Sequence, residues 1–185
     1  DLHLVLQIGR IHAVRFAEGS DTLYTYNLFP FRAGDVLNVR DIEQGLEQAK
    51  RLPSQDITVK LLPAQEPQMT DVLLTVTRGK NVYGTISLDD SGLKDTGKLQ
   101  LYGSVGVDQI FQRNDILRVG MNLDGAQDGY AKGTRGHNVS YTIPYGAHTF
   151  TLSYQRSKYH QTVESRPYDF ISAGDTNIST LSWDY

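Results

Sequence analysis

Between residue 82 and the C-terminus, apolar residues alternate with small polar ones, and this alternation constrains the fold more than any other feature. Because successive side chains of a β-strand point to opposite faces, each alternating run predicts a strand with one apolar and one polar face. Without helical patterns between them, the runs predict an antiparallel sheet. Six runs show the pattern, at residues 82–89, 98–107, 117–124, 138–143, 149–155 and 180–185.

The strand lengths and connections favour a transmembrane barrel. Each run is close to the roughly 9 to 11 residues that a tilted strand needs to cross the hydrocarbon layer. The fourth connection is a tight turn at residues 144–147, whereas the third, around 125–135, and the fifth, around 159–175, are expected to be long loops. Transmembrane barrels alternate short periplasmic turns with longer outer loops in this way. A soluble antiparallel sandwich or barrel shares the alternation but leaves the strand length and the uncharged apolar face unexplained.

The alternation assigns side chains to the two sides of such a barrel. We expect the lipid-facing residues to be Leu99, Leu101, Val119, Met121, Val139, Tyr141, Phe150 and Leu152. We expect the lumen-facing residues to be Gln100, Arg118, Asn122, Ser140, Thr149 and Ser153. This assignment predicts that an arginine is costly at a lipid-facing position and tolerated at a lumen-facing one.

Residues 9–79 predict a separate α+β unit. Strands are expected at 10–16, 57–61 and 72–76, and a short helix at 22–29 that Pro30 ends. A longer helix should follow Asn38, a favourable N-cap, and stop before Pro53. The predicted core consists of Ile42, Leu46, Leu52, Val59, Leu61, Val72 and Leu74.

The first 31 residues contain two further features, an alternating segment and a group of aromatic residues. The alternation of residues 1–8 predicts a strand that ends a preceding domain. Nearby aromatic side chains either fill the core under the short helix or form a recognition patch. These are Tyr24, Tyr26, Phe29 and Phe31.

Composition disfavours several classes of function. The 18 basic and 21 acidic residues are interspersed and give a net charge of −3, so nucleic-acid binding is not expected. Cysteine is absent, which excludes thiolate metal sites and cysteine nucleophiles. The five histidines have no metal-ligand spacing, so we expect no metal site. Asp89 and Asp90 precede Ser91 and Gly92, which indicates a turn rather than a catalytic pair, so we expect no catalytic residues and no cofactor.

Several motifs resemble a known family. The run Leu37–Gln48, followed by Arg51–Ser54, resembles the second POTRA domain of two-partner secretion transporters, the TpsB family. Leu88–Gly92 resembles the first barrel hairpin of that family, and Ser140–Gly146 resembles a later periplasmic turn. The resemblance implies an α+β POTRA domain followed by antiparallel transmembrane β-barrel strands. It assigns residues 1–8 to the end of a preceding POTRA domain, 9–79 to a POTRA domain and 80–185 to about the first six strands of a barrel, so we expect a fragment.

The resemblance also implies a function. It implies an outer-membrane transporter, with its POTRA domain in the periplasm, that exports a large exoprotein carrying an N-terminal secretion domain. The exoprotein would be a haemolysin, an adhesin or a contact-dependent-inhibition toxin, and no nucleotide is needed. A barrel-assembly factor that inserts outer-membrane proteins is the alternative, and a receptor or adhesin barrel is a third hypothesis.

Physical reasoning suggests how a partner could be captured. If the strand at 57–61 is a sheet edge, its unpaired backbone groups can pair with an extended chain, while the neighbouring helix borders the contact. A proline at Thr58 or Lys60 should then disturb the edge. The inert alternative is an edge that packs on the barrel or on a neighbouring domain. The expected partner-binding residues are Ile57, Thr58, Val59, Lys60, Leu61, Val39 and Leu46.

Overall fold

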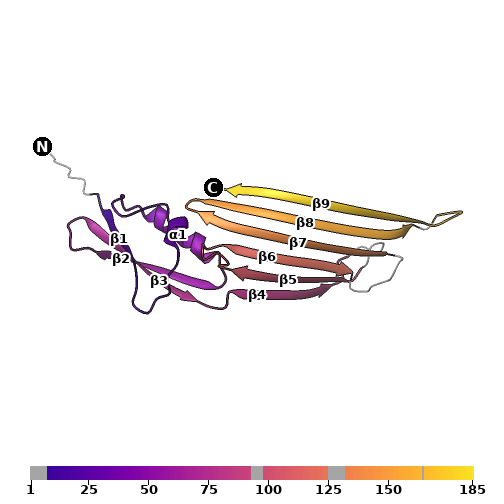
Figure 1. The fold of residues 1–185 in the computed structure, drawn as a ribbon, viewed down its shortest axis with the longest axis horizontal. Coiled ribbons are helices and arrows are strands. Elements are labelled where there is room, and N and C mark those ends of the chain that lie inside the picture. The colour runs from indigo at the N-terminus through magenta and orange to yellow at the C-terminus, as the bar shows by residue number, and fades with distance from the viewer. Residues whose placement is uncertain (1–7, 93–97, 125–131, 164) are drawn as a thin grey trace.

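The computed structural model describes residues 8–92, 98–124, 132–163 and 165–185, and it divides them between two sheets (Figure 1). A three-stranded sheet belongs to an N-terminal unit, and a six-stranded sheet extends away from it. All but the last residue of the strand expected at 1–8, and most of the long third connection, lie outside the described residues.

The N-terminal unit consists of β1 (Arg10–Phe16), the 3₁₀ turn η1 (Thr25–Asn27), the helix α1 (Val39–Lys50), β2 (Gln55–Pro63) and β3 (Met69–Arg78). The strand order is β1-β3-β2. The central strand, β3, pairs in parallel with β1 and antiparallel with β2. Consequently β2 is an edge strand, which is what the hypothesis of strand addition requires.

Local sequence sets the bounds of α1. The side chain of Asn38 accepts a hydrogen bond from the backbone N of Arg40 at 3.1 Å, which satisfies one of the free amides at the helix start. Asp41 in the first turn and Lys50 in the last complement the helix dipole. Pro53 follows closely and cannot extend the helix. Within the described part of the chain, no helix combines the length and apolarity needed to cross a membrane.

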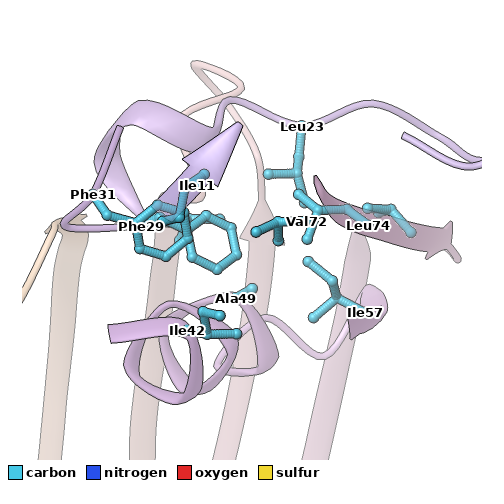
Figure 2. Packing of buried hydrophobic residues seen from close by; sticks show 11 residues of the cluster. Ile11, Leu23, Phe29, Phe31, Ile42, Ala49, Ile57, Val72 and Leu74 are labelled. Atoms are coloured by element: carbon cyan, nitrogen blue, oxygen red, sulfur yellow. The ribbon is translucent and has the colours of Figure 1, made fainter. Parts of the chain in front are cut away.

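The core of the N-terminal unit lies between α1 and its sheet. Figure 2 shows Ile42 and Ala49 of the helix facing Phe29 and the sheet residues. Four of the expected core residues are fully buried, namely Ile42, Leu52, Val72 and Leu74, whereas Val59 and Leu46 are partly buried against the cluster. The prediction for Leu61 is wrong, because its side chain is 42% exposed. Residues 60–63 are all exposed, so this end of β2 extends beyond the part of the sheet that is covered.

The short helix expected near the start of the chain is only a 3₁₀ turn of three residues. After it the chain turns so that Phe29 and Phe31 enter the core, with ring centroids 5.2 Å apart. A continued helix could not place both rings there, since residues two apart do not share a helix face. Tyr24 and Tyr26 remain exposed, so the aromatic group is divided between core and surface.

The second sheet is an antiparallel meander with its strands in sequence order. All six expected strands are present, and the sheet has β4 and β9 as its two open edges. Its strands are β4 (Val82–Asp89), β5 (Gln100–Asp108), β6 (Ile116–Asp124), β7 (Lys132–Tyr145), β8 (His148–Val163) and β9 (Phe170–Asp184).

The last strands are longer than the sequence suggested. The long fifth loop expected at 159–175 is wrong, because β8 continues to Val163 and β9 begins at Phe170. Lys158 pairs with Asp175 and His160 with Ala173 in the ladder between these strands. Cross-strand hydrogen bonds satisfy the backbone whatever the side chains are, so a polar stretch that resembles a loop can form a strand.

Candidate functional site

The outer edge of β2 is not covered by another strand of its sheet. In an antiparallel ladder, residues alternate between those whose N–H and C=O groups face the partner strand and those whose groups face away. Ala64 N donates to Met69 O at 3.0 Å and Gly79 N donates to Ser54 O at 2.7 Å, so the even-numbered residues of β2 bond to β3. The outward-facing amides are therefore those of Ile57, Val59 and Leu61.

Two of these outward amides are available for pairing. The Ile57 amide donates to Asp56 Oδ1 at 2.9 Å, whereas no described residue accepts a hydrogen bond from the amide of Val59 or Leu61. The amides of Thr58 and Lys60 face β3 instead. A proline at either of those two positions would therefore remove a bond to β3 and not an outward-facing donor.

The side chains expected to bind a partner differ in accessibility. Thr58, Lys60 and Leu61 are exposed, and Val59 is half-buried. Ile57 is only 1% exposed and belongs to the core, so only its backbone reaches the edge. In α1, Val39 is 57% exposed, whereas Leu46 packs against the core. The edge strand and α1 are neighbours. Of the seven expected partner-binding residues, however, Ile57 and Leu46 pack mainly in the core.

A cluster of buried amide side chains joins the N-terminal unit to the second sheet. Asn27 is 4% exposed and donates from Nδ2 to Pro144 O at 3.1 Å and to Arg113 O. Asn114, which is 1% exposed, donates from Nδ2 to Tyr24 O and to Asn27 Oδ1, both at 3.0 Å. Because buried amides are costly when unpaired, these bonds fix η1 against two turns of the second sheet. We call this contact the junction.

A second set of bonds brings the start of β2 to the same place. Gln55 Nε2 donates to Ala49 O at 2.7 Å, and Gln55 Oε1 accepts from Gln109 Nε2 at 2.9 Å. The fully buried Asp108 accepts from Ser54 N at 3.1 Å. The strand β2 therefore begins at the end of the second sheet that contacts the N-terminal unit, which we call the rim, and it runs away from that sheet.

The C-terminal end of α1 also contacts that rim. Gln48 Nε2 and Arg51 Nη1 both donate to Thr149 Oγ1, at 3.1 and 3.0 Å. Burial lowers the pKa of Arg51, the positive charge of Arg118 lowers it further, and Asp184 opposes the shift. A hollow of about 360 Å³ lies beside this contact, between α1 and the rim residues Thr149 and Asp184.

The register of the second sheet sorts its side chains into two faces. Paired residues of neighbouring strands share a face. One face is polar, and it carries Gln100, Arg118, Asn122, Ser140, Thr149 and Ser153. The other is apolar between β4 and β6 and near the rim, and it carries Leu101, Val119, Met121, Val139, Tyr141, Phe150 and Leu152. Leu99 precedes β5 and has no position in the register.

The sequence-based assignment of the two faces is thus consistent from strand to strand. The residues that approach the end of α1 are Thr149, Arg118 and Asp184, and all three belong to the polar face. The C-terminal end of α1 therefore lies beside the polar face, at the end of the sheet nearest the N-terminal unit.

Sequence reasoning missed the turn between β5 and β6, which supplies half of the junction. Gln109, Gln112 and Asn114 adopt left-handed backbone conformations, with φ of 62°, 56° and 57°. The buried Asp115 carboxylate accepts from Phe111 N and Arg113 N, each at 3.1 Å, and holds the turn. Such conformations persist when surrounding contacts over-determine them. A signal was present, since asparagine and aspartate tolerate such turns better than other residues.

Two of the histidines bond to ordinary protein partners. His12 Nδ1 lies 2.7 Å from Asp71 Oδ1, and His148 Nδ1 accepts from Trp183 Nε1 at 3.1 Å. Among the residues that the structure describes, no three histidine, aspartate or glutamate side chains gather in a way that could hold a metal ion.

Two family models match the chain. The model described as haemolysin secretion/activation protein ShlB/FhaC/HecB matches residues 68–185, which is more than half of the chain. A POTRA domain model matches residues 10–63, which include β1, α1 and β2.

Individual relatives match over nearly the whole chain. The outer membrane transporter CdiB-2 of Burkholderia pseudomallei (strain 1026b) is 44% identical over 183 residues, which cover 98% of this chain and 31% of the relative. The outer membrane transporter CdiB of Dickeya dadantii (strain 3937) is 34% identical over 183 residues, which cover 98% of this chain and 32% of the relative. The solved structure of CdiB from Escherichia coli has a TM-score of 0.86 at 28% identity, over 96% of this chain and 33% of that chain.

The chain spans about a third of the length of these relatives. The matches confirm the resemblance and the fold class predicted from the sequence, a POTRA domain followed by antiparallel strands of a partial barrel. The chain therefore belongs to the ShlB/FhaC/HecB family of haemolysin secretion and activation proteins, two-partner secretion transporters of the outer membrane whose POTRA domains lie in the periplasm.

Proposed function

We propose that this chain is the part of an outer-membrane transporter that captures a secreted partner protein in the periplasm and guides it to the barrel. Relatives that match nearly the whole chain are named outer membrane transporters, and a more distant one is the hemolysin transporter protein HpmB of Proteus mirabilis. The proposed partner is a large exoprotein with an N-terminal secretion domain. CdiB proteins are 44% and 34% identical against 29% for HpmB, which favours a contact-dependent-inhibition toxin as the cargo.

The observation that carries this proposal is the free edge of β2. The amides of Val59 and Leu61 face outward and have no acceptor among the described residues, so an extended chain can add to the sheet there. Main-chain pairing depends little on side-chain identity, which suits a partner that arrives unfolded. The exposed side chains of Thr58, Lys60 and Val39 lie beside the added strand or on the neighbouring helix and give it limited selectivity.

The direction of β2 supports delivery to the barrel. The strand starts at Gln55, which bonds to Gln109 in the turn between β5 and β6, and extends for nine residues, about 30 Å at the usual rise per residue. A chain paired along this edge would end at the rim of the second sheet. There the end of α1 lies beside the polar face, because Gln48 and Arg51 both donate hydrogen bonds to Thr149.

We further propose that the polar face lines the lumen. A water-filled barrel needs a polar interior and an apolar exterior, and strands of this kind alternate accordingly. The exterior residues would then contact lipid. The proposed lumen residues are Gln100, Arg118, Asn122, Ser140, Thr149 and Ser153.

The test of capture is an export assay with the full-length transporter and its exoprotein. Val59→Pro and Leu61→Pro each remove one outward amide while leaving the bonds to β3. Each should lower the amount of exoprotein in the medium by about fivefold or more, the effect of losing a hydrogen bond worth about 1 kcal/mol. The matched variant Val59→Thr keeps the amide, and Lys60→Gln removes only a charge, so both should export near the parent level.

The comparison must be made at equal amounts of inserted transporter, because a misfolded POTRA domain would also lower export. Resistance of the POTRA domain to limited proteolysis provides that check. Parent-level export by both inserted proline variants would refute strand addition at β2. Equal loss in Val59→Thr would instead assign capture to the side chain.

A further inference from the structure

A cationic hollow lies on the apolar face of the second sheet, at the end remote from the POTRA domain. It has a volume of about 370 Å³ and is lined by Met121 and Leu123 of β6, Arg135, Gly136 and His137 of β7, and Arg156 and Lys158 of β8. Two apolar side chains therefore border a group of basic ones. The whole chain carries a net charge of −3, so this gathering of positive charge is local.

The basic residues share pairing rows with apolar ones. In the row formed by Leu101, Leu123, Arg135, Lys158 and Asp175, the exterior side chains change from apolar on β5 and β6 to charged on β7, β8 and β9. The strands of a barrel are tilted by about 40°, so a row perpendicular to them climbs through the membrane. Neighbours in one row therefore lie at different depths.

The position of Arg135 along β7 gives its height. The Tyr145 end of this strand is periplasmic, because Gly146 N in the following turn donates to Asn27 O of the POTRA domain at 2.9 Å. Arg135 lies ten residues from Tyr145 on β7, which corresponds to about 25 Å along the membrane normal for a tilted strand. The apolar band of an outer-membrane barrel is also about 25 Å tall. The hollow therefore lies at the outer boundary of the hydrocarbon layer.

In the described part of the chain, basic side chains of the hollow outnumber the acidic side chains that pair with them. Arg156 Nη2 lies 2.6 Å from Asp175 Oδ2, and Lys158 Nζ lies 3.2 Å from the same oxygen, so both cations share a single carboxylate. Arg135 is exposed and has no ion-pair partner among the described residues. Among the residues that the structure describes, three permanent cations thus face one anion, which gives this group a net positive charge at the level where lipid headgroups lie.

We propose that this hollow binds a phosphorylated lipid of the outer leaflet, with its phosphate on Arg135 and Lys158 and an acyl chain along Met121 and Leu123. Arginine and lysine bind phosphate through charge-assisted hydrogen bonds, and two such groups at the edge of an apolar surface match an anionic amphiphile. A soluble acidic ligand would contact the basic side chains but would leave Met121 and Leu123 without an apolar partner. The proposal rests on the assignment of the apolar face to lipid, and it is independent of partner capture at β2.

The test measures binding of a lipid probe to the full-length transporter in detergent. The probe is bis-phosphorylated lipid A, and lipid A without phosphates is the reference. The double variant Arg135→Gln/Lys158→Gln should weaken binding of the phosphorylated probe by about tenfold or more, since charged hydrogen bonds are lost. The matched control, Arg40→Gln/Lys50→Gln, removes two exposed positive charges from the POTRA domain and should bind the lipid probe as the parent does.

Two further measurements keep the proposal falsifiable. Arg135→Lys retains the charge and should bind within about threefold of the parent, whereas Arg135→Gln alone should show part of the loss. Should the double variant fail to fold, Arg135→Gln is the deciding variant, because this exposed side chain is in no described ion pair. Unchanged affinity in the double variant, or equal affinity of the parent for both probes, would overturn the proposal. Loss of lipid binding with normal export would leave the proposed function intact.

Discussion

Asn114 Nδ2 donates a hydrogen bond to Asn27 Oδ1 at 3.0 Å, and this pair joins the POTRA domain to the turn between β5 and β6. Both side chains are almost completely buried, and each also bonds to a backbone carbonyl, that of Tyr24 for Asn114 and that of Pro144 for Asn27. A swinging POTRA domain would have to break all of these bonds together. The pair therefore fixes the direction of β2 relative to the barrel.

Removing either amide should loosen the junction. Asn27→Ala leaves the partners of Asn27 unpaired, and Asn114→Gly deletes that side chain while keeping a residue that accepts φ of 57°. Each change should destabilise the junction by about 1–3 kcal/mol, so amide hydrogen exchange in residues 109–115 should accelerate by about 5- to 150-fold.

The double variant provides the control for that prediction. Because both residues belong to one network, the combined effect should be smaller than the sum of the single effects. Additive acceleration would show that Asn27 and Asn114 act separately.

Two positions on β2 should respond differently to truncation. Ile57 is 1% exposed in the core, so Ile57→Ala should destabilise the POTRA domain by about 2–5 kcal/mol. Leu61 is 42% exposed at the end of the same strand, and Leu61→Ala should change stability by less than about 1 kcal/mol. Pulse proteolysis of the full-length transporter in urea measures both changes in stability, and similar destabilisation by the two would contradict the burial of Ile57 in the core.

The two faces of the second sheet should tolerate charge differently. Val119 pairs with Val105 and Val139 on the apolar face, and Val119→Arg should destabilise the inserted barrel by about 2–4 kcal/mol. Asn122 belongs to the polar face, and Asn122→Arg should have little effect. Unfolding of the full-length protein from lipid vesicles measures the difference, and equal destabilisation would refute the assignment of lipid and lumen faces.

Gly45 in α1 is a case where packing outweighs helix propensity. Alanine is favoured over glycine by about 1 kcal/mol in a helix interior. However, a methyl group at Gly45 would overlap the ring of Phe29, which is 4% exposed and packed on Phe31. Gly45→Ala should therefore be destabilising, by about 1–3 kcal/mol.

A compensating change tests the cause of that loss. Phe29→Leu removes part of the ring, so Gly45→Ala should cost less in a Phe29→Leu background than in the parent. Thermal unfolding of the POTRA domain in the full-length transporter measures both, and the same loss in the two backgrounds would exclude the ring as its cause.

Local sequence determined most of the secondary structure. Period-2 alternation located all six strands of the second sheet, and Asn38 and Pro53 bounded α1, because these signals act between residues close in the chain. Alternation also sorted Arg118 and Val119 onto opposite faces, since that depends only on their being adjacent in a strand. The run Leu37–Gln48 indicated the family because it too is a signal within one continuous stretch of the chain.

Tertiary structure alone decided which groups are buried and which are free. The burial of Ile57 and the exposure of Leu61 depend on where the covered part of the sheet ends. The outward direction of the Val59 amide depends on the register of β2 with β3. The sequence of β2 alone does not specify that register. The bond between Asn27 and Asn114 links residues 87 positions apart, and such a pair is set by how two sheets meet rather than by either local segment.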